Sequence, residues 1–142
     1  MNWETLWKLF SWVCQVLRWV TRRKPRKGVF LVVEDDPRDA EIIELRLKKR
    51  GWRCEIATSG EVAAGLVKHT FYPVAFVDLR LPGMPGQALL RILSRDTPNT
   101  HLVVVCGEPN DLDKLPDGQF VCLMRKPPSL EAIEDMLNKL KL

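Results

Sequence analysis

Three short apolar runs, each ending abruptly at charged residues, limit what this chain can become. Such runs, rich in β-branched and aromatic residues and bounded by turn signals, are typical of strands buried on both faces of a parallel sheet. In open α/β sheets, ligands bind in the crevice beyond the carboxyl ends of the strands, which is where the charged residues would lie. The runs and their endings are residues 29–33 before Glu34-Asp35-Asp36-Pro37, residues 74–77 before Asp78, and residues 119–124 before Arg125-Lys126-Pro127-Pro128.

Two of these endings carry carboxylates. If the two strands are neighbours, Glu34, Asp35 and Asp78 converge in one crevice, and clustered carboxylate oxygens suit Mg²⁺. Structural roles are also open, because Asp36 can cap the helix that begins at Pro37 and Asp78 can cap its own turn. Both interpretations can hold together, since capping by Asp36 leaves Glu34 and Asp35 available for a cation.

The third ending supplies positive charge. Lys126 can reach the carboxylates, or an anion held between them. The bond between Lys126 and Pro127 can be cis, which would fix the direction of the loop. On its own, a Lys-Pro pair after a strand is most often part of an ordinary loop, so its significance depends on the two acidic endings.

Helical segments are expected between the runs. Apolar periodicity and flanking Ser, Gly and Pro residues favour helices at residues 40–50, from residue 60 to about 67, after residue 86 and at residues 130–140. Between residues 108 and 118, two prolines and a glycine leave room for barely two helical turns. Strands and helices therefore alternate along the chain, as in an α/β fold.

The order of these features, an acidic pair, a single aspartate and then Lys-Pro, resembles the receiver domain of two-component response regulators. The segments that carry the resemblance are VFLVVEDDP, YPVAFVDLRLPGMPG and RKPPSLEAI, within residues 28–142. The resemblance implies a flavodoxin-like, doubly wound (βα)5 sandwich with a five-stranded parallel sheet. It also implies a signalling module and not an enzyme, with at most phosphotransfer to its own aspartate and autodephosphorylation.

The resemblance assigns a role to each matching position. Asp78 is similar to the phospho-accepting aspartate, Glu34 and Asp35 to the acidic metal-binding pair, and Lys126 to the lysine that pairs with the phosphoryl group. Arg80 would offer its backbone carbonyl to Mg²⁺, as the residue two beyond the aspartate does in this family. The implied cofactor is Mg²⁺, and the implied partner is a histidine kinase or a phosphotransfer protein that donates the phosphoryl group in a phosphorelay.

Two positions depart from the family pattern. Cys106 stands where the family has the Ser or Thr of its conformational switch, and Leu123 stands where it usually has Tyr or Phe. A thiol is a weak hydrogen-bond donor, so Cys106 would hold a phosphoryl oxygen less firmly than a hydroxyl. One alternative is therefore a non-phosphorylated pseudo-receiver that acts as a membrane-recruited or oligomeric scaffold. A further alternative is a redox input through Cys106.

The first 20 residues differ in composition from the rest. They hold four of the five tryptophans and neither Gly nor Pro. On a helical projection their polar residues form one narrow stripe and their apolar residues fill most of the circumference. Such a helix can lie in a membrane interface, pair with itself or a partner, or, least favoured, span the membrane. We therefore divide the chain into residues 1–27, an amphipathic helix and basic linker, and residues 28–142, the receiver domain.

Charge and cysteine usage bound the surroundings of the protein. The formal net charge is +4, and five basic residues lie together in the linker between Arg22 and Lys27. This is a basic junction and not a basic domain, and no helix-turn-helix pattern follows, so we expect no contact with nucleic acid. Four scattered cysteines without metal spacing fit a reducing compartment. The expected location is cytoplasmic, with peripheral attachment at the inner face of the cell membrane through residues 1–24 as an option, beside self-association through the same residues.

Overall fold

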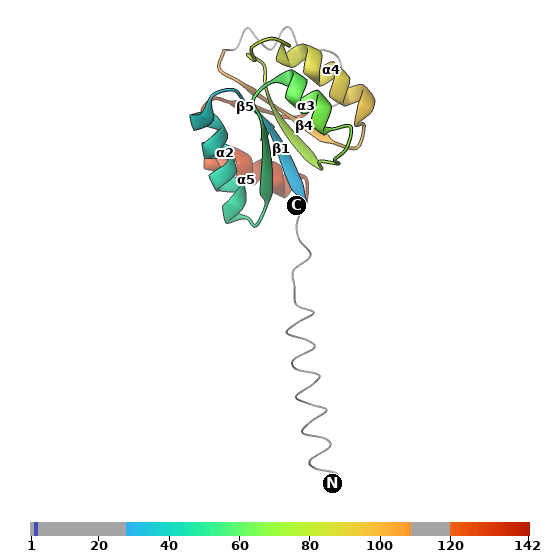
Figure 1. Ribbon diagram of the computed structural model, residues 1–142. Coiled ribbons are helices and arrows are strands. Elements are labelled where there is room, and N and C mark those ends of the chain that lie inside the picture. Colours follow the sequence, from blue (N-terminus) through green and yellow to red (C-terminus); the bar gives the residue numbers. More distant parts are fainter. Residues whose placement is uncertain (1, 3–27, 109–119) are drawn as a thin grey trace.

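Five parallel strands form one sheet in the order β2-β1-β3-β4-β5 (Figure 1). This computed structural model describes residue 2 and residues 28–108 and 120–142. The predicted N-terminal helix and the short helical stretch predicted before residue 119 lie outside the described residues. The strands are β1 (Val29–Val33), β2 (Arg53–Ala57), β3 (Val74–Asp78), β4 (His101–Cys106) and β5 (Phe120–Arg125).

Two layers of helices cover the two faces of this sheet (Figure 1). Phe30 and Val32 of β1 pack on the side of α2 and α5, whereas Leu31 and Val33 pack on the side of α3 and α4. Burial on both faces explains why the runs are continuously apolar, and it confirms the doubly wound α/β fold. The helices are α2 (Pro37–Lys49), α3 (Gly60–Leu66), α4 (Gly86–Asp96) and α5 (Leu130–Lys139).

Three of the four described helices begin at a side-chain cap. A cap of this kind accepts a hydrogen bond from a backbone N–H that the helix itself cannot satisfy. The predicted cap at Asp36 is confirmed, and α2 therefore begins at Pro37, three residues before the first residue of the expected range. The capping bonds run from the Arg38 amide to Asp36 (2.8 Å), from the Val62 amide to Ser59 (3.2 Å) and from the Ala132 amide to Ser129 (3.0 Å).

The fourth helix, α4, begins against the end of β3 in a way that only glycine permits. A Cβ atom added to Gly86 would lie 2.2 Å from the Asp78 carbonyl oxygen and 2.6 Å from the Leu79 Cα. Both neighbours are backbone atoms, so neither could move aside cheaply. Gly86 thereby lets α4 start directly beside the strand end that carries Asp78, and its amide donates to the Leu79 carbonyl at 3.2 Å.

Two arginines, one within α2 and one at its C-cap, tie this helix to the segment that follows β5. Arg46 donates to the Pro128 carbonyl, and Arg50 pairs with Glu134 on α5. The loop between β5 and α5 is thus held by α2 as well as by its own chain.

Among the residues that the structure describes, no helix is both long enough and apolar enough to cross a membrane.

Candidate functional site

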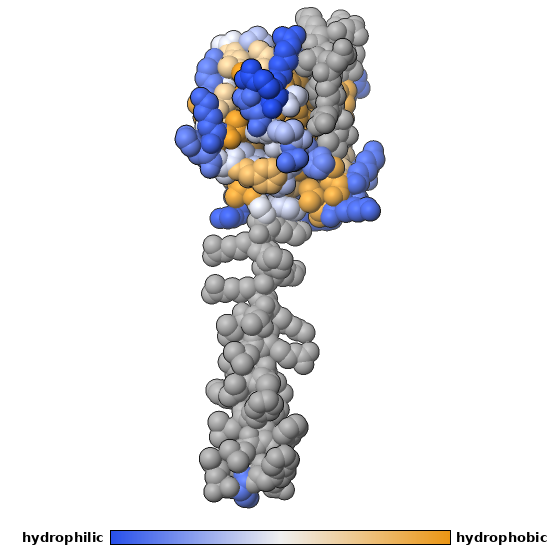
Figure 2. Space-filling view, turned by 90° about the vertical axis from the view of Figure 1, so that its right-hand side faces the viewer, coloured by the Kyte–Doolittle hydropathy of each residue, from blue (hydrophilic) through white to orange (hydrophobic). Residues whose placement is uncertain are grey.

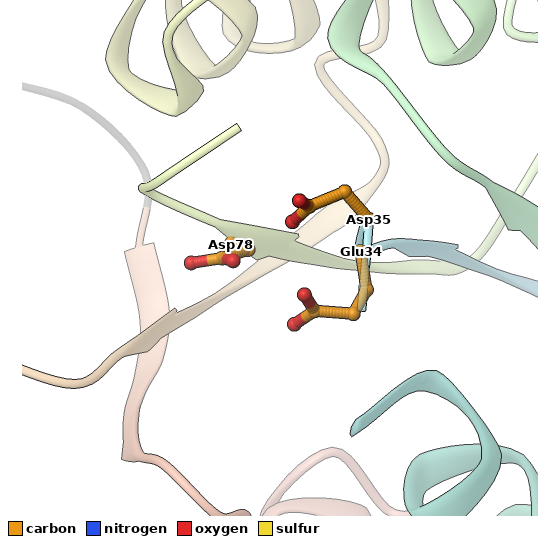
Figure 3. Close-up of side chains that lie close together, drawn as sticks. All are labelled: Glu34, Asp35 and Asp78. Carbon is orange, nitrogen blue, oxygen red and sulfur yellow. The ribbon is translucent and has the colours of Figure 1, made fainter. Parts of the chain in front are cut away.

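The carboxyl ends of β1 and β3 bring three carboxylates together. The two strands are parallel neighbours, with Val33 paired to Val77, so the residues that follow them meet at one edge. Glu34, Asp35 and Asp78 each offer a carboxylate oxygen, and these oxygens lie within 4.8 Å of one another. Figure 3 shows the three side chains beside the ends of the two strands. The predicted convergence is therefore present in the structure.

These three carboxylates differ in burial. The Glu34 and Asp78 residues are 2% and 3% exposed, whereas Asp35 is exposed. Each buried carboxylate accepts a backbone amide: Glu34 accepts the Asp36 N–H at 3.1 Å, and Asp78 Oδ1 accepts the Arg80 N–H at 3.0 Å. The second bond holds the backbone at Arg80 against Asp78, beside the cluster.

One ammonium group serves this cluster. Lys126 Nζ lies 2.7 Å from Asp78 Oδ2 and 2.8 Å from Glu34 Oε2. The Lys126 amide donates to the Cys106 carbonyl at 2.9 Å, and the Lys126-Pro127 bond is cis, as considered from the sequence. The lysine thus reaches the acids, as expected, from a loop fixed to the end of β4.

Sequence reasoning missed a fourth carboxylate. Asp39 Oδ2 lies 3.2 Å from Lys126 Nζ, and its side chain is 24% exposed. The residue stands in the first turn of α2, where an acid favours the helix dipole, and that role alone would explain it in sequence. A signal was present, because a residue three beyond the Asp36 cap lies one helical turn away and therefore near the same strand end.

A second missed residue holds the loop after Asp78. Glu61 Oε1, in the first turn of α3, accepts the Met84 amide at 2.8 Å. Gly83, with φ of 75°, lies against the same carboxylate, which a Cβ atom at that position would meet at 2.8 Å. This loop follows Arg80 directly, so α3 steadies the segment that borders the cluster.

The pKa values of Glu34 and Lys126 are both raised, which favours the neutral form of the acid and the charged form of the base. Burial raises the pKa of Glu34 from 4.5 to about 7, and the charge of Asp78 adds to this, against hydrogen bonds from Lys126 and the Asp36 amide. Partial burial alone would lower the pKa of Lys126, but its hydrogen bonds to Asp78 and Glu34 and their charges outweigh it, so that pKa is raised. Lys126 therefore stays positively charged at neutral pH, while Glu34 titrates near neutral pH.

This donor set fits Mg²⁺. The cluster is made of hard oxygen donors, and one lysine does not neutralise the carboxylates around it. Asp35 is exposed, and a cavity of about 450 Å³, lined also by Glu41 and Glu44, adjoins it. Mg²⁺ keeps several water ligands and needs such access to solvent.

The two switch positions lie on the neighbouring strands β4 and β5. Cys106 is the last residue of β4 and is 6% exposed, one position beyond the Val105 that pairs with Asp78. Leu123 lies in β5 opposite Val104, and it is 44% exposed. The structure thus places Cys106 near Asp78, the candidate phosphoacceptor. It leaves Leu123 exposed at the position where the family usually has an aromatic side chain.

A family model described as the response regulator receiver domain matches residues 30–138. Among curated relatives, the cell cycle transcriptional regulator CtrA of Caulobacter vibrioides is 36% identical over 77 residues, which cover 54% of this chain and 33% of CtrA. The uncharacterized transcriptional regulatory protein YkoG of Bacillus subtilis is 28% identical over 91 residues, 64% of this chain and 38% of YkoG. The chain thus spans little more than a third of the length of these relatives.

Solved structures agree with this match. A CheY-like response regulator receiver domain from Methylobacillus flagellatus is 28% identical, with a TM-score of 0.70, over 80% of this chain and 98% of that one. The response regulator TrrA of Thermotoga maritima, solved in complex with Mg(2+)-BeF, is 18% identical with a TM-score of 0.73, over 80% and 98% of the two chains. At that identity, the second likeness concerns the fold alone.

Proposed function

This chain belongs to the response regulator receiver domain family of two-component signalling, and on that premise we propose that Asp78 accepts a phosphoryl group. Receiver domains bind Mg²⁺ at an acidic pocket and interact with histidine kinases or phosphotransfer proteins. One observation carries the proposal: Lys126 bridges two buried carboxylates, Glu34 and Asp78, next to the exposed Asp35. Burying two carboxylates and an ammonium carries a desolvation cost, and charged groups buried together in this way are typical of functional sites. The arrangement suits phosphoryl transfer.

The chain's own residues would act through charge and position. A carboxylate oxygen of Asp78 attacks the phosphorus of a phosphohistidine, and the phosphorus–nitrogen bond breaks with its electron pair returning to the imidazole. The Arg80 amide, bonded to Oδ1, orients the carboxylate for this attack. Lys126 then exchanges its bond with Asp78 for one with a phosphoryl oxygen, which offsets the added negative charge.

We assign the metal site to Glu34, Asp35 and Asp78, with the Arg80 backbone carbonyl as a fourth ligand. When bound, Mg²⁺ supplies the positive charge that reduces repulsion between the acceptor carboxylate and the phosphoryl oxygens. Glu34 must lose its proton to act as a ligand, and because its pKa is raised to about 7, a metal ion would compete with a proton for this carboxylate near neutral pH.

The test uses the full chain with Mg²⁺ and either acetyl phosphate or phosphoramidate, followed by intact mass. We expect a gain of one phosphate that requires Mg²⁺ and disappears in Asp78→Asn. Asp135→Asn, which changes an exposed aspartate of α5 in the same way, should keep the gain. Absence of the gain with both donors, in protein that unfolds cooperatively, would contradict the proposal.

The scaffold alternative rests on Cys106 and Leu123. A thiol and an aliphatic side chain cannot form the hydroxyl–aromatic pair that relays phosphorylation in this family, so a phosphorylated and an unphosphorylated chain would then share one conformation. Because this alternative is a scaffold that is not phosphorylated, absence of the mass gain in folded protein would support it, and altered amide hydrogen exchange in β4 and β5 on phosphorylation would oppose it.

A further inference from the structure

The amino ends of the strands lie opposite the site. In a parallel α/β fold the helices run back from the carboxyl ends, so all four described helices end where the strands begin. The chain enters here: Val29 pairs with Arg53, and a Cβ atom on Gly28 would lie 3.5 Å from the Pro73 side chain. Residues 1–27 therefore connect to the domain at this end.

This end of the domain is basic. Asp96 is the sole carboxylate residue among the described residues 46–53, 67–73, 94–101 and 138–142, and it pairs with Arg95 at 2.6 Å. We call six of the exposed residues here the basal surface: Lys49, Arg53, Lys68, Lys139, Lys141 and Phe71. These residues come from α2, β2, α5 and the segments that follow α3 and α5, so they converge from different parts of the chain.

An exposed aromatic side chain lies in the same surface. Phe71 is 65% exposed, the highest value among the exposed large hydrophobic residues described, while the adjoining Tyr72 is buried. It lines a cavity of about 290 Å³ together with Lys68, His69, Asp96 and Pro98. Figure 2 shows orange, apolar surface between blue, hydrophilic side chains along the lower edge of the domain. Apolar and charged groups thus lie close together on this surface.

Helix dipoles explain only part of this pattern. Lys49 and Lys139 stand in the last turns of α2 and α5, where a cation favours the negative helix end. Arg53 begins a strand and Phe71 precedes one, so neither has such a role. Phe71, 65% exposed among these cations, offers an apolar contact beside positively charged ones.

We propose that the basal surface docks on a membrane containing anionic lipids. Its cations would lie against lipid phosphates, and Phe71 would enter the headgroup region, where aromatic rings are favoured. The tryptophan-rich sequence of residues 1–20 and the basic linker precede Gly28, which lies at this same end. The acidic site lies at the opposite end of the strands and would remain open to its phosphodonor.

The test measures partition of the full chain onto vesicles of phosphatidylcholine with 30% phosphatidylglycerol, by flotation. Lys68→Glu should weaken binding roughly tenfold or more, since each basic residue near an anionic surface contributes about fivefold. Its matched control is Arg91→Glu, an exposed reversal in the middle of α4. Phe71→Ser should weaken binding about threefold beside Leu45→Ser, an exposed apolar control on α2.

Several outcomes would overturn the proposal. These are failure of the wild-type chain to bind anionic vesicles, equal binding to pure phosphatidylcholine, or equal effects of Lys68→Glu and Arg91→Glu. Because a basic surface can also bind nucleic acid, duplex DNA is the competitor. Displacement of the chain from vesicles by DNA at phosphate concentrations equal to the lipid phosphate would assign the surface to nucleic acid instead. Thermal unfolding of each variant excludes misfolding as the cause.

Discussion

The two ends of the sheet carry opposite charges and hold them in opposite ways. At the carboxyl end, Glu34, Asp78 and Lys126 are wholly or largely buried, and the Lys126 ammonium lies 2.7–2.8 Å from an oxygen of each acid. At the amino end, lysines such as Lys68 and Lys141 extend into solvent. The parallel topology contributes to both, because helix N-termini favour acids at one end and helix C-termini favour bases at the other. The charges at the carboxyl end are fixed in position by ion pairs. Those at the amino end are exposed and therefore available for contact with an external surface.

The largest expected effect comes from adding a side-chain atom at the carboxyl end of the sheet, where the backbone is closely packed. Gly86→Ala should destabilise the protein by about 3 kcal/mol or more, because its Cβ would overlap backbone atoms of Asp78 and Leu79. Thermal unfolding should show a large fall in Tm together with loss of Mg²⁺ binding. The control is Gly65→Ala in α3, whose Cβ meets nothing within 4 Å and should leave Tm unchanged or higher. Equal effects would contradict the close approach.

Acidity should affect the carboxyl end through Glu34. Its folded pKa of about 7 lies above the 4.5 expected when unfolded, so the folded chain binds the extra proton between these values. The resulting contribution, roughly 3 kcal/mol, is complete below pH 4.5 and is lost as pH rises through 7. In Mg²⁺-free buffer, denaturant unfolding should show this loss in the wild type and not in Glu34→Gln. If Glu34→Gln and an exposed control, Glu41→Gln, kept the same pH slope, the assignment would be wrong.

Removal of a lysine should distinguish the ends directly. Lys126→Met leaves Asp78 and Glu34 buried without their shared cation, and we expect a loss of about 2 kcal/mol, reduced because Lys126 is 21% exposed. Lys139→Met at the amino end should change stability by less than about 0.5 kcal/mol. Urea unfolding of both variants without Mg²⁺ provides the comparison, and equal losses would remove the distinction between fixed and available charge.

The smallest expected effect is at Asp39. Asp39→Asn removes the most distant and most exposed of the three carboxylates around Lys126, so stability should fall by about 0.5 kcal/mol. Urea unfolding should place it close to the exposed control Asp135→Asn and well short of Lys126→Met. A loss as large as that of Lys126→Met would show that Asp39 belongs with the buried pair.

The sequence was sufficient to predict the parts of the site that lie at strand ends. Apolar runs located Glu34 and Asp78, and the alternation of strands and helices implied parallel neighbours. Asp39 and Glu61 were missed, because their contacts depend on how α2 and α3 are rotated about their axes. The basal surface was missed for a similar reason, since Phe71 and Lys139 come together only after the helices are packed.

The hydrogen bond from Arg46 of α2 to the loop after β5 has a consequence for ligand binding. Arg46 holds the Pro128 carbonyl and the Lys126 amide is bonded to Cys106, so the loop is ordered before any anion arrives. Immobilising a lysine on a mobile loop would cost conformational entropy with each binding event. Here that cost falls on folding, so an anion that meets Lys126 retains more of its interaction energy as affinity.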